Sequence, residues 1–206
     1  MLAVLVLVWC QLLGLSSASF ILPSAGRARR TRMAAQEASS GQPAERRASC
    51  FCGRVRVTVF DGDAASSSSI CHCSICRRLS GAPFLANVLF KRSNVALDGG
   101  DGAALAADAL AEVKTSKHVV RYRCASCASP VLATLGKDLA AVPLVLFPRP
   151  HPPSWNPMHH MHYGDRVFDV PDGKTKFAGR FGYSQRVDDD GLPLPPAEEL
   201  PPAPGA

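Results

Sequence analysis

Residues 70–84 read ICHCSICRRLSGAPF, and the three cysteines in this stretch are the strongest structural signal in the sequence. Cys71, Cys73 and Cys76 are so close along the chain that their sulfur atoms can converge on one point without a long loop. A structural zinc site has four protein ligands, whereas a catalytic zinc site has three and keeps the fourth position open. The stretch therefore predicts either an open zinc site or a site closed by a distant residue.

The other cysteines of the chain decide how this cluster is interpreted. Cys50 and Cys52 form a C-x-C pair, and Cys124 and Cys127 form a C-x-x-C pair. Two short-spaced pairs are the usual ligand set of a structural zinc, so we expect these four residues to bind one ion and to join two distant segments. Cys10 lies in a predicted targeting segment, and the odd number that remains argues against a framework built of disulfides alone. The cluster of three then has no cysteine left to close it.

Histidines are the alternative fourth ligand. Residues 157–163 read PMHHMHY, and in a strand His160 and His162 would share one face, with Met161 on the other. His159 is a further candidate, whereas His72 lies between two of the cysteine ligands and would reach the same ion with difficulty. A disulfide or a cluster without metal is a third possibility, and a secreted protein would favour it.

The pattern of apolar residues between the two ends of the chain predicts a mainly β domain. Residues 53–60 place three valines on one face of a strand and polar residues on the other. Gly and Pro recur at short intervals, a helical turn or two over 74–81 would end at Gly81, and the stretch most compatible with a longer helix is 103–112. Further strands are predicted over 84–90, 113–124, 131–135 and 142–147.

The two ends differ in composition from the middle. Residues 1–15 are apolar but shorter than the roughly 20 residues that span a bilayer, which is typical of a signal peptide. The following residues, rich in Arg, Ala and Ser, are similar to a transit peptide, so 1–47 is predicted to be a bipartite presequence for import into a plastid, with secretion or the endomembrane system as the alternative. Residues 187–206 are acidic and rich in Pro, which predicts a disordered tail.

The middle segment, residues 48–186, carries the predicted zinc-binding domain. It is moderately basic, which suits an anionic small molecule. It lacks a long run of Lys and Arg with interleaved aromatic residues, so no nucleic-acid partner is expected, and no membrane association is expected for the mature form.

The sequence resembles the glutathione-dependent formaldehyde-activating family, which includes centromere protein V. The stretches that carry the resemblance are ASCFCGRVRV, CHCSICRRLSGAPF and VVRYRCASCASPV, followed by PMHHMHYGDRVFDVPDGKTKF with its Asp172-Gly173 pair. The resemblance implies a Mss-four-like β fold with two zinc ions. It assigns a structural zinc to the four cysteines Cys50, Cys52, Cys124 and Cys127. It assigns a zinc used in catalysis to the three cysteines Cys71, Cys73 and Cys76.

The resemblance also implies a reaction. Glutathione, the co-substrate, adds through its thiol to formaldehyde and gives S-hydroxymethylglutathione, a carbon–sulfur lyase reaction in reverse. Arg77 and Arg78 are then candidate anchors for the carboxylates of glutathione. The alternative within the same family is a zinc-stabilised binding module without catalysis.

One position departs from the family pattern. Ala128 follows the last cysteine of the C-x-x-C pair, where the family usually has Gly. If this position requires a positive φ, alanine costs about 1 kcal/mol there.

Overall fold

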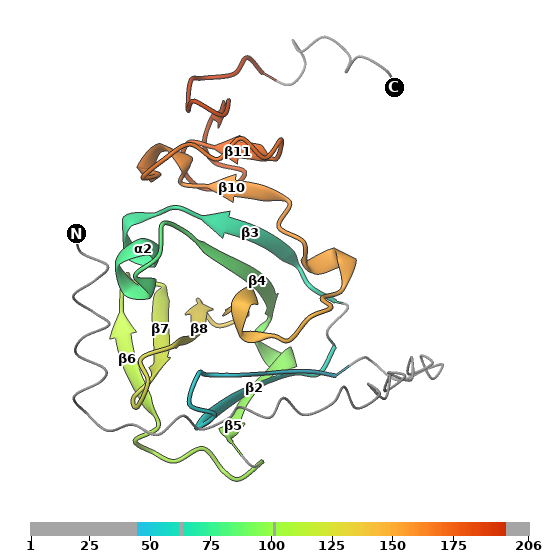
Figure 1. Ribbon diagram of the computed structural model, residues 1–206, viewed down its shortest axis with the longest axis vertical. Helices are drawn as coiled ribbons and strands as arrows, with labels where there is room; N and C mark the ends of the chain where they lie inside the picture. Colours follow the sequence, from blue (N-terminus) through green and yellow to red (C-terminus); the bar gives the residue numbers. More distant parts are fainter. Residues whose placement is uncertain (1–44, 62–63, 101, 197–206) are drawn as a thin grey trace, which may run out of the picture. The chain divides into compact units, whose positions relative to one another are not determined.

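The computed structural model describes residues 45–61, 64–100 and 102–196. These residues form two β-sheets and one α-helix, so the prediction of a mainly β fold is confirmed (Figure 1). The predicted presequence lies almost wholly outside the described residues, and its role stays a prediction. No helix in the described part of the chain is both long and apolar enough to cross a membrane.

The smaller sheet has three antiparallel strands in the order β1-β2-β5. They are β1 (Arg46–Ser49), β2 (Val55–Val59) and β5 (Val95–Gly99). The predicted alternation along β2 is confirmed, because Val55, Val57 and Val59 are fully buried, although Thr58 on the other face is buried as well. The sheet begins at Arg46, two residues before the predicted start of the domain at 48.

The larger sheet has the strand order β12-β11-β10-β3-β4-β9-β8-β7-β6. Neighbouring strands are antiparallel, except that β10 is parallel to both β3 and β11. The strands are β3 (Ser67–Cys71), β4 (Leu85–Lys91), β6 (Leu110–Lys114), β7 (Val119–Cys124), β8 (Pro130–Leu135), β9 (Leu139–Pro143), β10 (His159–Met161), β11 (Thr175–Phe177) and β12 (Arg186–Val187).

The predicted short helix follows β3 directly. It is α2 (Ser74–Ser80), and it ends at Gly81, whose φ of 67° is the left-handed conformation that favours glycine. Four 3₁₀ turns complete the described structure: η1 (Arg92–Asn94), η2 (Leu144–Leu146), η3 (Pro153–Trp155) and η4 (Tyr163–Asp165).

Two segments differ from the prediction. Residues 103–112 form no helix; the first part is irregular and β6 begins at Leu110, because Leu110 to Lys114 pair with β7 instead. The predicted strand over 142–147 ends at Pro143 and continues as η2, since the chain leaves the edge of β4 there.

The hydrophobic core contains side chains from both sheets. The three valines of β2 belong to the same buried cluster as Val88 and Phe90 of β4 and Val142 of β9, and Trp155 packs edge-on against Phe90. Side chains alternate between the two faces of a strand, so the residues of β4 and β9 that lie between these core residues point to the other face of the larger sheet. That second face carries the candidate site described below.

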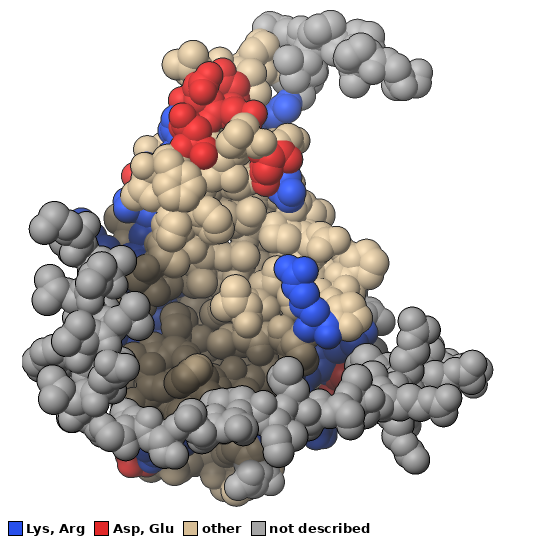
Figure 2. Space-filling model, viewed as in Figure 1, with Lys and Arg blue, Asp and Glu red and all other residues tan. Residues whose placement is uncertain are grey.

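The chain stays part of the fold beyond the predicted domain boundary at 187. Val187 pairs with Pro193, and Asp189 forms an ion pair of 2.6 Å with the buried Lys176. Acidic side chains gather over this C-terminal region on the face shown in Figure 2. Residues 197–206 lie outside the described residues.

Candidate metal centres

The four cysteines predicted to bind one ion lie together at a junction between the two sheets. Their sulfur atoms are all within 4.8 Å of one another. Cys50 follows β1 of the smaller sheet, and Cys124 is the last residue of β7 in the larger sheet. Two of the sulfur–sulfur distances are 3.6 Å (Cys50 to Cys52) and 3.7 Å (Cys52 to Cys124). Tetrahedral zinc with bonds of about 2.3 Å requires sulfurs about 3.8 Å apart, so this cluster fits zinc.

The loops that carry these cysteines are tightly fixed by backbone contacts. The amide of Val55 donates to the Cys50 sulfur at 3.3 Å, and the amide of Phe51 donates to Ser129 Oγ at 3.2 Å. Burial opposes ionisation of Cys127, but hydrogen bonds from Ser129 and from Cys52 lower its pKa to about 5. Cys127 is therefore the cysteine of this cluster that favours the thiolate, the form that binds a metal.

Two backbone positions, one against the C-x-C loop and one in the C-x-x-C loop, are sterically demanding. A side chain at Gly100 would overlap the carbonyl of Gly53, which follows the C-x-C pair. Ala128 has a φ of 60°, and its amide donates to the carbonyl of Cys124 at 2.9 Å. This position therefore has the positive φ at which a Cβ is unfavourable, so Ala128 carries backbone strain that Gly would not.

The second cluster forms where β3 passes into α2. Cys71 is the last residue of β3, Cys73 caps the helix by accepting a hydrogen bond of 3.3 Å from the amide of Cys76, and Cys76 lies in the first turn. The three sulfurs lie within 4.8 Å of one another, and among the described residues no histidine nitrogen or carboxylate oxygen joins the group. The helix turn thus brings three ligands to one point, as the spacing predicted.

The three thiols share negative charge unequally. The thiols of Cys71 and Cys76 donate hydrogen bonds to the Cys73 sulfur and lower its pKa to about 2. The pKa of Cys71 is raised because its thiol donates to Cys73 and because the site is buried. A second thiolate next to the first is unfavourable unless a cation offsets the repulsion, so the donor set suits a soft divalent metal such as zinc.

His160 is in a position that excludes it as the fourth ligand in this structure. The side chain is fully buried, its Nδ1 lies 2.8 Å from His72 Nε2, and its Nε2 lies 3.0 Å from Asp172 Oδ2. Both ring nitrogens are therefore engaged.

The expectation that His160 and His162 share a strand face was wrong. β10 ends at Met161, and His162 has a left-handed φ of 55° that turns the chain into η4. Its Nδ1 is 4.0 Å from Asp165 Oδ2, and it does not belong to the cysteine group.

The contacts of His160 extend into a buried polar network that the sequence did not predict. Burial opposes ionisation of Asp172, but hydrogen bonds from His160, Lys174 and Lys176 lower its pKa below the ordinary value. Because a carboxylate only accepts, His160 Nε2 donates to Asp172, and its Nδ1 accepts the proton of His72 Nε2. Burial also lowers the pKa of His72 to about 4, so this ring is neutral at pH 7. The network therefore holds His72, which lies between Cys71 and Cys73, in place.

The predicted anchors Arg77 and Arg78 lie in the middle of α2. Arg77 Nε donates to the backbone carbonyl of His72 at 2.9 Å, so part of its guanidinium braces the cysteine loop.

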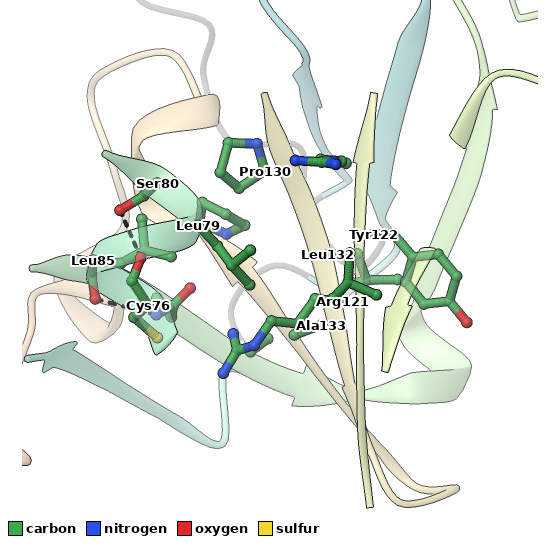
Figure 3. A pocket seen from close by; sticks show the side chains of 14 residues that line it. Cys76, Leu79, Ser80, Leu85, Arg121, Tyr122, Pro130, Leu132 and Ala133 are labelled. Atoms are coloured by element: carbon green, nitrogen blue, oxygen red, sulfur yellow. Dashed lines mark hydrogen bonds between the residues drawn. The ribbon is translucent and has the colours of Figure 1, made fainter. Parts of the chain in front are cut away.

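A pocket adjoins the cluster of three cysteines. Cys76, Leu79 and Ser80 of α2 line one side, and residues of the larger sheet line the other, among them Arg121 of β7 (Figure 3). A second hollow on the same face reaches Cys71 and also includes Cys76 and Arg121. The candidate metal centre is thus open to a space that a small molecule could enter, and sequence reasoning had not singled out Arg121.

Comparison with known proteins places the chain in a family. The family model described as glutathione-dependent formaldehyde-activating enzyme matches residues 45–165, which include both cysteine clusters. No curated protein matches the chain significantly. Among solved structures, the chain is similar to a Rhodobacter sphaeroides protein solved as a structural genomics target, with 19% identity, a TM-score of 0.40, and coverage of 52% of this chain and 91% of that one.

Proposed function

The chain belongs to the glutathione-dependent formaldehyde-activating enzyme family, and on that premise we propose that it joins a small thiol to an aldehyde. The family is enzymatic, and its name supports a glutathione-dependent formaldehyde-activating or related function for this chain. Glutathione and formaldehyde are the pair we propose first, with S-hydroxymethylglutathione as the product. In the reaction the sulfur of the thiol forms a bond to the carbonyl carbon, the C=O π bond breaks, and the thiol proton ends on the oxygen.

The observation that carries this proposal is the difference between the two clusters. Cys50, Cys52, Cys124 and Cys127 provide four sulfurs around one point, a complete tetrahedral set. The other cluster provides three sulfurs next to a pocket, and no described histidine or carboxylate completes it. We therefore assign a structural zinc to the first set and a zinc with an exchangeable position to the second.

The residues around the second cluster support thiol chemistry in specific ways. A zinc held there would stabilise the thiolate form of a bound thiol. Cys73 holds negative charge because two thiols and one amide donate to it, and Arg77 fixes the loop by its bond to the His72 carbonyl. We retain Arg77 and Arg78 as candidate carboxylate anchors, because they are the basic residues of the helix that carries Cys76.

Metal analysis of variants tests the assignment of the two sites. The purified protein should contain two zinc ions per chain. Cys73→Ser should lower the content to one ion and leave the protein folded, whereas Cys124→Ser should unfold it, since its site joins the two sheets. If Cys73→Ser unfolds the protein as severely as Cys124→Ser, both sites are structural, and a zinc-stabilised binding module becomes the better function.

Activity is tested separately by following adduct formation from glutathione and formaldehyde by NMR exchange. The uncatalysed reaction provides the baseline. The wild-type protein should accelerate exchange above that baseline and Cys73→Ser should not; equal rates for the two proteins would refute the enzymatic proposal.

A further inference from the structure

Arg121 lies on the same face of the larger sheet as the cluster of three cysteines. Register aligns Arg121 of β7 with Ala133 of β8, Ala133 with Ala141 of β9, Ala141 with Leu89 of β4, and Leu89 with Ser67 of β3. Side chains at directly opposed positions point to one face, and along a strand this face recurs at every second residue. Cys71 lies four residues after Ser67 in β3, so it shares this face.

Two of the side chains between these positions are alanines, which leaves room for a ligand beside Arg121. Ala133 and Ala141 separate the strand of Arg121 from the strands nearer the cysteines, and both line each of the two hollows. Asn87 and Cys76 also line both hollows. The two hollows therefore adjoin each other along the side chains between Arg121 and Cys76.

The guanidinium of Arg121 is available to a ligand. It extends from β7 toward Cys76 (Figure 3), and its one side-chain hydrogen bond among the described residues is a long one of 3.3 Å from Nε to Thr115 Oγ1. Within the described residues, Arg121 forms no ion pair, and neither hollow has an acidic side chain in its lining. The positive charge of Arg121 acts on the nearby Cys76 thiol, and no carboxylate of the described residues pairs with it, so this half-buried cation can also hold an anionic ligand.

We propose that Arg121 binds a carboxylate of the thiol substrate while the thiol itself lies at the cluster of Cys71, Cys73 and Cys76. This assignment rests on the proposed function and narrows it: the substrate is a low-molecular-weight thiol that also carries a carboxylate, as glutathione does. Because guanidinium and carboxylate can form two parallel hydrogen bonds, Arg121 determines specificity among thiols. It provides a carboxylate anchor on the sheet, across the pocket from α2.

Binding measurements with matched thiols test the proposal. The probes are glutathione, its diethyl ester and 2-mercaptoethanol, titrated calorimetrically into the zinc-loaded full chain. Wild-type protein should bind glutathione about 10- to 100-fold more tightly than the diester, the range expected for one charge-assisted contact. Arg121→Met should reduce this preference by about 10-fold or more, leaving at most the share that Arg77 or Arg78 contributes through the second carboxylate, whereas Arg121→Lys should retain more of it.

Controls separate a binding role from a structural one. Lys114→Met removes the same charge from an exposed position of the neighbouring strand β6 and should leave both affinities unchanged. Arg121→Met should also keep its zinc content and its affinity for 2-mercaptoethanol, which has no carboxylate. A uniform loss of affinity for all three thiols would mean that Arg121 only maintains the fold, and would overturn the inference.

Two outcomes distinguish this inference from the proposed function. If wild-type protein binds 2-mercaptoethanol and glutathione but does not distinguish glutathione from its diester, the Arg121 assignment is wrong and the thiol site stands. If it binds none of the three thiols, the proposed function fails, and the assignment of Arg121 fails with it.

Discussion

Replacing Ala128 by glycine should stabilise the protein, although glycine normally destabilises a fold. The φ of 60° at Ala128 costs about 1–2 kcal/mol for a residue with a Cβ. Glycine removes that cost but increases the entropy of the unfolded chain by about 0.4–1 kcal/mol. The methyl group is exposed, so little apolar burial is lost. The net gain is about 0.5–1 kcal/mol, or about 2–3 °C in Tm for a domain of this size.

The measurement is urea unfolding at a fixed concentration of free zinc, so that any metal bound by the cysteines contributes equally to the stability of both proteins. The fluorescence of Trp155, which is buried in the core, can follow the transition. Ala125→Gly is the matched control: it makes the same change three residues earlier, in the same exposed turn, where φ is not positive. This control should lose about 0.4–1 kcal/mol. If Ala128→Gly loses as much as Ala125→Gly, the strain argument is refuted.

Three further predictions concern other parts of the fold. Gly100→Ala should destabilise the protein by more than about 1 kcal/mol, because the added methyl group would overlap a carbonyl of the C-x-C loop. The same variant should retain less zinc during dialysis, and unchanged zinc retention would contradict this prediction. Asp172→Asn should cost about 1–3 kcal/mol in urea unfolding, because it removes the carboxylate that accepts hydrogen bonds from His160 and Lys176 while Asp189 still pairs with Lys176. Asp169→Asn on the surface should cost less than about 1 kcal/mol, and equal costs would refute this. Burial lowers the pKa of His159 in the folded protein, so the unfolded chain binds more protons below about pH 6.5 and the free energy of unfolding should decrease as the pH falls from there. His159→Gln should reduce this dependence of stability on pH. An identical dependence in the variant would exclude a contribution from His159.

The sequence was informative where the relevant distances along the chain are short. The C-x-C and C-x-x-C spacings predicted which cysteines gather, and the alternating valines of β2 predicted its buried face. Gly81 predicted the end of α2, because the left-handed conformation there suits glycine. These features depend on local geometry, which can be predicted from the residue types of a short segment.

The features that were missed depend on which strands become neighbours. The contact of His160 with His72 requires β10 to lie parallel beside β3, and nothing in either segment encodes that pairing locally. His162 has no adjacent Gly or Pro to signal that the strand ends at Met161. Arg121 could not be related to Cys71 from the sequence, since their shared face follows from the order of five strands in the larger sheet.

The four-cysteine cluster has a consequence for the order in which the protein can mature. Cys50 and Cys52 lie more than seventy residues before Cys124 and Cys127, so a chain that emerges from the ribosome or from a membrane pore carries half a site until the second pair follows. During that interval the first two thiols are exposed to oxidants and to competing metal ions. With the proposed zinc in this site, a cell that produces this protein would need reducing conditions and available zinc at the moment when residue 127 appears, and the supply of metal would then limit how much of the chain becomes folded protein.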